Sequence, residues 1–354
     1  MHAADATVAI SRPPRRGFRY WLGRASLTFG ILLAAVLTVL YHTIGDRHWL
    51  SDIIVVFPPT AWCLAIIVLF IPVAVSGSWR LAGVAIITII SFLIINEEWL
   101  SLLRKPMTPQ SPRDGLRVIC WNQFTNTDWT IPFQDLSPWD PDVVVFTESP
   151  DGQASEAIHK QLTGQWKGYH WHDEGDSAIL SRFPMEVITS KKIGPWDKPA
   201  LARLEIPPAG NSPTTHTIIL CGVRFMFSAA AQPPTALLGD LSGWPAHHKL
   251  RLAQFDNFRE LLADIRGDKE QVIVTGDFNT RGGSKSLRAL RKAGLHDGWP
   301  ESGTGWGATY MAELPIARID QTWLSSGLRA SQSRAIRGRI SDHRMVIMDI
   351  KLRN

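Results

Sequence analysis

The stretch Val272-Ile-Val-Thr-Gly-Asp-Phe-Asn279 decides how the second half of this chain is interpreted. Its first four residues predict a buried strand, and Gly276 permits an unusual backbone turn where that strand ends. Because strand side chains alternate, Asp277 and Asn279 point the same way if the extended geometry persists. A carboxylate beside a carboxamide suits a site that accepts a proton or touches a metal and also donates to an oxyanion. Considered alone, the same residues also fit an ordinary turn.

Other segments of the C-terminal two-thirds repeat this pattern of an apolar run with a polar side chain at its edge. They are 116–122, 142–149, 177–182, 217–224, 319–325 and 341–350. Helical patterns at 155–162 and 249–265 lie between them. The second pattern predicts a helix that buries Leu250 and Phe255 and leaves Arg251 to water. Strands mixed with such helices predict a layered α/β domain with a functional cleft along one rim of a sheet.

The formal excess of positive charge lies entirely before Asp114. That segment contains ten basic and five acidic residues, whereas the rest of the chain contains 27 of each. The polar two-thirds therefore lacks the gross basic excess on which nucleic-acid binding draws. The three cysteines show neither a zinc spacing nor a disulfide framework.

The N-terminal third predicts a membrane anchor. After a basic tail at 1–25, apolar runs follow at about 26–45, 52–75 and 80–103. Each run approaches the roughly 20 residues that cross a bilayer. Their very short connections favour three transmembrane helices within 26–103 over a signal peptide followed by buried core helices.

The basic tail also predicts the orientation of the chain. Because such tails stay cytoplasmic, three crossings place the remainder on the extracytoplasmic side of the cell membrane. Pro58-Pro59 interrupts the second run, and Glu97-Glu98, near the end of the third, is expected at the membrane interface. A Pro-rich linker at 104–113 should act as an extended spacer before a globular domain at 114–354.

Seven short motifs, taken in order, resemble those of a known family. They are Trp121-Asn122, Glu148-Ser149, Ala178-Ile-Leu-Ser-Arg182, Gly276-Asp-Phe-Asn279, Thr309-Tyr310, Arg318-Ile-Asp320 and Ser341-Asp-His343. In order and spacing this set resembles the endonuclease/exonuclease/phosphatase superfamily over about residues 114–354. The resemblance implies a four-layered α/β sandwich of two packed sheets flanked by helices, here preceded by the transmembrane helices. It also implies a divalent-cation-dependent attack of water on a phosphoester.

The resemblance implies catalytic roles for four residues. Asp277 would orient or deprotonate water, and Asn279 would hold the phosphate. His343, beside Asp320, would form an imidazole-carboxylate pair that stabilises the pentacovalent phosphorus. These residue types suit phosphoester hydrolysis, which needs an in-line activated water and neutralised phosphoryl oxygens.

The implied cofactor is Mg²⁺ or Mn²⁺. Glu148 offers a hard oxygen ligand, with Asn122 and Asp342 as neighbouring ligands or supports. The residues leave open whether one or two ions act.

One position departs from the family pattern. Many relatives carry a histidine where this chain has Arg224. A guanidinium can clamp a phosphate but cannot donate a proton as imidazole does. His247 or His248 could supply the missing imidazole only by reaching back into the site. The departure keeps open an alternative function, a weakly active or inactive membrane-tethered module that binds phosphates or partners.

The substrate stays open among DNA, RNA, a phospholipid headgroup and a small phosphorylated molecule. Charge does not favour nucleic acid, because the local patch of Lys285, Arg288, Arg291 and Lys292 is interpreted as a solvated face. The chain is thus predicted to be a membrane-anchored phosphoester hydrolase of phosphodiesterase, nuclease or phosphatase type. Nothing in the sequence indicates its oligomeric state.

Overall fold

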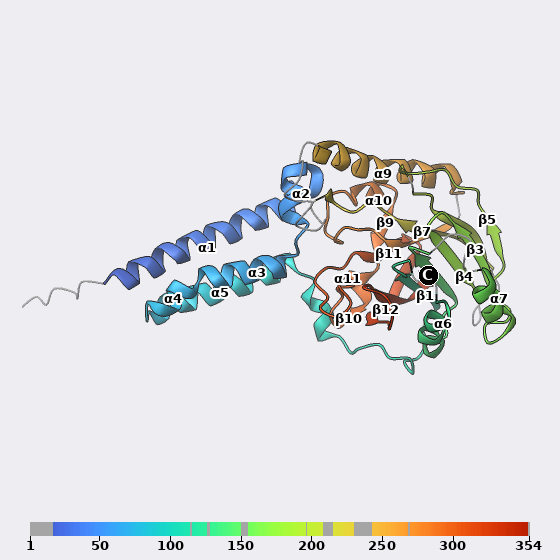
Figure 1. The fold of residues 1–354 in the computed structure, drawn as a ribbon, viewed down its shortest axis with the longest axis horizontal. Helices are drawn as coiled ribbons and strands as arrows, with labels where there is room; N and C mark the ends of the chain where they lie inside the picture. Colours follow the sequence, from blue (N-terminus) through green and yellow to red (C-terminus); the bar gives the residue numbers. More distant parts are fainter. Residues whose placement is uncertain are drawn as a thin grey trace, which may run out of the picture.

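Two β-sheets packed face to face make up the C-terminal part of the protein, and a bundle of helices projects from it (Figure 1). The computed structural model describes residues 17–352 except 114, 126–127, 150–154, 196, 208–214, 230–242 and 268–269. We call the described residues from 115 onward the sheet domain and residues 17–96 the helical region. The two sheets and their flanking helices confirm the predicted sandwich.

The first sheet has seven strands in the order β10-β12-β13-β1-β2-β4-β3. They are β1 (Leu116–Asn122), β2 (Val143–Thr147), β3 (His170–Glu174), β4 (Ser177–Ser181), β10 (Gly303–Thr304), β12 (Leu328–Arg337) and β13 (Arg344–Leu352). β1 runs parallel to β2 and antiparallel to β13. Both β1 and β2 are buried along their whole length, as continuous runs of β-preferring residues predict.

The second sheet has six strands in the order β5-β6-β7-β8-β11-β9. They are β5 (Met185–Val187), β6 (Ala200–Ile206), β7 (His216–Arg224), β8 (Gln271–Asp277), β9 (Leu295–Asp297) and β11 (Asp320–Ser325). β8 lies between parallel β7 and antiparallel β11. Since β1 runs parallel to β2 and β7 to β8, each sheet brings two carboxyl-terminal strand ends together at one edge.

Apolar side chains fill the space between the sheets and under the helices on both outer faces. The inner layer includes Val145 and Ile179 of the first sheet and Leu220 and Ile273 of the second. Helices α6 (Thr130–Leu136) and α7 (Ser155–Thr163) cover the first sheet, α9 (Trp244–Ile265) and α10 (Arg288–Lys292) cover the second, and short helical turns occur at Ser137–Trp139 (η3) and Trp299–Ser302 (α11). The sheet domain is therefore layered as helix, sheet, sheet, helix.

The helical region contains α1 (Phe18–His42), α2 (Trp49–Val55), α3 (Pro59–Leu69), α4 (Ile71–Val75) and α5 (Trp79–Asn96), with a 3-10 turn at Gly45–Arg47 (η1). By length and composition, α1 and α5 could each cross a membrane. The predicted second span is broken, because α2 and the α3–α4 segment meet at 74°. The break falls at Pro58, which has no N–H to continue the hydrogen-bond ladder of α2. The described residues thus contain two candidate spans, or three if the bent pair counts as one.

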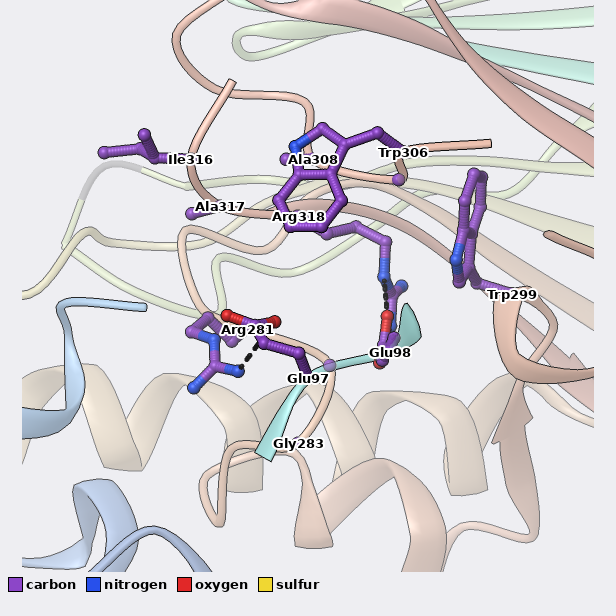
Figure 2. Close-up of a pocket in the computed structure, with 12 residues that line it drawn as sticks. Glu97, Glu98, Arg281, Gly283, Trp299, Trp306, Ala308, Ile316, Ala317 and Arg318 are labelled. Carbon is purple, nitrogen blue, oxygen red and sulfur yellow. Dashed lines mark hydrogen bonds and ion pairs between the residues drawn. The ribbon is translucent and has the colours of Figure 1, made fainter. Parts of the chain in front are cut away.

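Two glutamates join the end of α5 to the sheet domain (Figure 2). Arg318 makes a two-point contact with Glu98, with Nη2 2.7 Å from Oε1 and Nε 2.7 Å from Oε2. Arg318 also contacts Asp297, and Arg281 lies 3.8 Å from Glu97. These glutamates were expected at the membrane interface; in the structure they bind arginines of the sheet domain.

Two aspartates make a second joint, between η1–α2 and α9. Arg251, with 1% of its surface exposed, places Nη1 3.7 Å from Asp46 Oδ2 and 3.7 Å from Asp52 Oδ1. The prediction that Arg251 faces water and Leu250 the core was wrong, since Leu250 is about half exposed. The prediction considered the periodicity of this helix alone and did not include its contacts with the helical region. Asp46 and Asp52 of that region bind Arg251 and bury it.

The predicted spacer at 104–113 is extended in part but packs on the sheet domain. It follows a 3-10 turn at Trp99–Leu103 (η2). Arg104 donates to the carbonyl of Gly303 at 3.1 Å, and Met107 is buried under the first sheet. The segment therefore packs on the sheet domain through contacts of its own.

Candidate active site

The end of β8 brings Asp277 and Asn279 together. Gly276 adopts φ 150°, and a Cβ there would lie 1.9 Å from the carbonyl oxygen of Val223, so only glycine fits. The Asn279 backbone N–H donates to Asp277 Oδ1 at 2.8 Å, and its side-chain Nδ2 donates to Asp277 Oδ2 at 3.0 Å. The extended geometry does not persist, because Asn279 has φ 47°. A left-handed turn, not strand alternation, makes these two side chains meet.

Asn122 links the first sheet to Asp277. Its Nδ2 donates to Glu148 Oε1 and to Asp277 Oδ2, both at 3.0 Å. Its side-chain oxygen accepts the backbone N–H of Phe124 at 2.8 Å, which fixes the orientation of the amide. Asn122 therefore holds two carboxylates in place by donating to both.

His343 and Asp320 form a buried pair beside this cluster. His343 Nδ1 lies 2.8 Å from Asp320 Oδ2. The hydroxyl of Thr309 accepts the Asp320 backbone N–H at 3.1 Å, and the ring of Tyr310 lies 5.1 Å from the imidazole. The structure thus brings together predicted residues from the ends of five strands, which are β1, β2, β8, β11 and β13.

The site is electrostatically coupled. Burial and the neighbouring Asp320 raise the pKa of Asp277 to about 7, although His343 opposes the shift. Burial disfavours the imidazolium of His343, but the charge and hydrogen bond of Asp320 raise its pKa to about 10. Near neutral pH the site therefore contains a protonated imidazole beside a carboxylate that can take up or release a proton.

Arg224 lies at the site but is bound to carboxylates. Its Nη2 is 2.9 Å from Glu148 Oε1 and its Nη1 is 3.0 Å from Asp176 Oδ2. Its Nε is buried without a hydrogen-bond partner among the described residues. Neither His247 nor His248 replaces the missing imidazole. His248 Nδ1 lies 3.4 Å from Asp52 Oδ2, and neither histidine lines the cavity that Glu148, Asp277 and His343 line.

A cavity of about 590 Å³ opens over these residues. Its polar lining includes Glu148, Arg224, Asp277, Asn279, Asp342 and His343, together with Asp46, Asp52, Arg251, Thr280, Arg281 and Ser284. Its apolar lining includes Phe124, Phe227, Tyr310, Ile316, Ala317 and Ile319 of the sheet domain and Val55, Val56, Phe57 and Pro58 of the helical region. Sequence reasoning missed Asp176, the second partner of Arg224, and the contribution of residues 55–58 to the cavity, because only the tertiary fold brings these segments to the site.

The donor set fits a hard divalent cation. Among the described residues, the compact group whose ligand atoms lie within 4.8 Å of one another is Asp277, Asp320 and His343, rather than the predicted ligands Glu148 and Asp342. Oδ1 of Asp320 and Oδ1 of Asp342 are buried and accept no hydrogen bond from the described residues. Carboxylate oxygens of this kind are the ligands that Mg²⁺ and Mn²⁺ prefer.

The predicted basic patch is largely a solvated face, since Arg288, Arg291 and Lys292 are exposed and Lys285 is half-buried. Arg291 lies over the ring of Trp323 and donates to the carbonyl of Gly282 at 2.9 Å. The Lys285 backbone N–H donates to Asp46 at 2.6 Å. The patch therefore does not form a row of free cations next to the cavity.

Comparison with known proteins identifies the sheet domain. The model of the endonuclease/exonuclease/phosphatase family matches residues 121–343. No curated protein matches the chain significantly.

Solved structures share the fold. A Bacteroides vulgatus endonuclease/exonuclease/phosphatase aligns with a TM-score of 0.50 and 14% identity, over 68% of this chain and 100% of that one. A Bacteroides thetaiotaomicron mannosyl-6-phosphatase gives 0.50 and 14%, over 67% and 100%. The Neisseria 3′ phosphatase NExo, bound to product DNA hairpin, gives 0.50 and 17%, over 67% and 100%. At these identities the likeness concerns the fold.

Proposed function

The chain belongs to the endonuclease/exonuclease/phosphatase family, and on this premise we propose that it is a membrane-anchored, divalent-metal-dependent hydrolase of phosphoester bonds. The single observation that carries the proposal is the hydrogen-bonded cluster of Asn122, Glu148 and Asp277, whose two carboxylates line the cavity together with His343. Such a cluster has the acid, base and ligand types that metal-assisted hydrolysis needs.

Glu148 and Asp342 would hold Mg²⁺ or Mn²⁺, and Asn122 would support Glu148. When bound, the cation would neutralise charge on the phosphoryl oxygens. Asn122 donates to both Glu148 and Asp277, so it keeps the ligand and the base at a fixed separation.

Asp277 is the proposed general base for the attacking water. A pKa of about 7 leaves a substantial ionised fraction at neutral pH and matches the group to this task. His343, held protonated by Asp320, would stabilise charge on the pentacovalent phosphorus. Asn279 would hold the phosphate after exchanging its contact with the carbonyl of Phe225, now at 2.9 Å, for a substrate oxygen.

Arg224 favours a second candidate function. Its ion pair with Glu148 neutralises the proposed metal ligand, so the site could bind a phosphorylated ligand without cleaving it. The retained base and imidazole support hydrolysis, in which Arg224 leaves Glu148 and clamps the phosphate. Hydrolysis is therefore the function we put forward.

The proposal includes three membrane crossings and an extracytoplasmic sheet domain. It is supported by two long apolar helices and the bent α2 to α4 pair, together with the basic tail, of which residues 1–16 lie outside the described residues and residues 18–25 begin α1. A reporter fused after Asn354 should be active only outside the cytoplasm, and cytoplasmic activity would overturn this orientation.

Hydrolysis is tested with the full chain purified in detergent, with Mg²⁺ or Mn²⁺, against DNA, RNA, phospholipids and small phosphoesters. At least one substrate should be cleaved, activity should vanish with chelator, and Asp277→Asn should lose about 10² to 10⁴-fold in rate. Asp256→Asn, the same change at an exposed position on α9, should keep full activity. Binding without cleavage across the whole panel would favour the second candidate.

A further inference from the structure

We propose that the substrate is an amphiphile, a phosphoester headgroup on a long hydrocarbon tail, and that this tail lies against residues 55–58 of the protein. We call these residues the elbow, because they join α2 to α3 at the 74° bend. The inference rests on the proposed function and assigns a substrate class to the same site.

The lining of the cavity combines the polar groups of the proposed active site, which we call the floor, with apolar side chains, which we call the wall. Glu148, Asp277 and His343 lie at the floor, where the phosphoester would be cleaved. Phe57 and its elbow neighbours form a wall contributed by a candidate membrane span, so the apolar surface of that span continues into the cavity. A headgroup at the floor would leave an attached chain beside this wall.

The apolar side chains at the wall are too exposed for ordinary core packing. The exposed fractions are 43% for Phe57, 58% for Phe124, 38% for Phe227 and 36% for Ile316. Several large apolar side chains gathered around one opening mark a site that binds apolar material. These side chains belong to both the helical region and the sheet domain, so the hydrocarbon tail of the substrate would lie between the two.

The helix beyond the elbow presents exposed apolar side chains, as a helix in contact with lipid would. α3 begins at Pro59, and its Leu64 and Val68 are each more than 60% exposed, as expected of side chains in contact with acyl chains. α3, α4 and α5 lie together on one side of the sheet domain (Figure 1). An amphiphile in the adjacent leaflet could therefore reach the floor while its chain stays in apolar surroundings.

The arginines of the cavity argue against a polynucleotide. Three arginines line it, and each already faces a carboxylate: Arg224 faces Glu148, Arg251 faces Asp52, and Arg281 faces Glu97. Binding of nucleic acid requires several cations that neutralise successive phosphates. A single phosphoester group with an apolar chain matches this lining better.

The test compares substrates that have long and short hydrocarbon tails on the same headgroup. It uses the full-length protein in dodecyl maltoside micelles, which contain no phosphate. The substrates are hexadecyl and butyl phosphate, and dihexadecanoyl and dibutanoyl phosphatidylglycerol. Hexadecylphosphonate and butylphosphonate, which are not hydrolysed, report binding alone. Each methylene that leaves water should strengthen binding by up to about fourfold, so the long-chain member of each pair should be strongly preferred.

Variants separate the elbow from simple partitioning into micelles. Phe57→Ser, and independently Phe227→Ser, should lower the long-to-short ratio of kcat/KM at least about tenfold, as expected for the loss of a few buried methylenes. Leu50→Ser, an exposed position on α2 that does not line the cavity, should keep the wild-type ratio. Equal ratios in all three variants would overturn the inference.

Failure of the inference and failure of the proposed function give different results. Hydrolysis without any chain-length preference overturns the amphiphile and leaves the hydrolase standing. Tighter binding of hexadecylphosphonate than of butylphosphonate, dependent on Phe57 but without hydrolysis of any substrate, overturns the hydrolase and leaves the amphiphile site standing. No hydrolysis and no chain-dependent binding overturns both.

Discussion

Replacing Arg251 by methionine should weaken the joint between the helical region and the sheet domain and also disturb the site. The guanidinium is buried between Asp46 and Asp52, at 3.7 Å from each carboxylate. At an effective dielectric constant of 20, one such pair corresponds to about 4 to 5 kcal/mol before desolvation. Removing one partner of a buried pair typically costs about 3 to 5 kcal/mol, because the remaining charge stays buried.

The remaining contacts of the two aspartates place the expected cost at the lower end of that range. Asp52 still accepts the Ser228 hydroxyl at 2.7 Å, and Asp46 still accepts the Lys285 backbone N–H at 2.6 Å. We therefore expect Arg251→Met to destabilise the protein by about 3 kcal/mol, or roughly 6 to 12 °C in Tm. Arg251 also lies 3.4 Å from the carbonyl oxygen of Asn279, so KM should rise as well.

Thermal unfolding of four proteins in one detergent measures this effect. They are wild type, Arg251→Met, Asp52→Asn and the double variant. The double variant should be less destabilised than the sum of the single variants, with a coupling of about 1.5 to 3 kcal/mol. Arg259→Met, on an exposed part of α9, is the matched control and should cost less than about 1 kcal/mol. Additive single effects, or equal losses in Arg251→Met and Arg259→Met, would refute the reasoning.

Three further changes test other parts of the structure. Burial and Asp176 raise the pKa of Asp197 to about 6. The free energy of unfolding of the wild type therefore falls by up to about 3 kcal/mol as the pH rises from about 4 to 6. Melts between pH 4 and 8 should show Asp197→Asn gaining that much stability relative to the wild type, and a difference that does not change with pH contradicts this. Gly276→Ala should cost roughly 3 kcal/mol or more, because its Cβ would meet the Val223 carbonyl, and wild-type melting would exclude the clash. Arg224→Ala should raise KM for the phosphoester about tenfold or more, whereas unchanged affinity would remove its role as a phosphate clamp.

The sequence predicted the longest strands that are buried along their whole length and missed several others, among them β6 and β12. The predicted runs of β1, β2 and β8 end within two residues of the observed strands. β12 was missed because its burial alternates irregularly around a register shift between Ala330 and Gln332, so neither a continuous apolar run nor a regular alternation appears. A strand that is buried along its whole length can be predicted from its own sequence, because its residues form a continuous apolar run. A half-buried strand cannot, because the pattern of its side chains depends on which of them the neighbouring elements cover.

The same distinction explains what could be predicted of the site. Asn122 ends one buried strand and Glu148 follows another, so their place at the same edge follows from strand direction. The ion pair of Arg224 with Asp176 depends on how a loop of one sheet meets a strand end of the other, which no local pattern contains. Asp277 and Asn279 were predicted to meet, but through strand alternation; the observed cause is a left-handed residue after the strand.

The acidic residues of the N-terminal third contain information that periodicity overlooked. Five precede Asp114, and the four within the described residues all contact the sheet domain: Asp46, Asp52, Glu97 and Glu98. A carboxylate within an apolar segment is costly unless it is paired, so such residues mark the points where the segment meets a polar partner. Asp46 and Asp52 lie between α1 and the elbow, and Glu97 and Glu98 follow the end of α5. Asp46 binds the backbone of the loop after Asn279, and the two glutamates bind Arg281 and Arg318. If the helices span the bilayer, these contacts fix the height of the site above the lipid, and an opening lined by Phe57 then faces the leaflet from which an amphiphile would come.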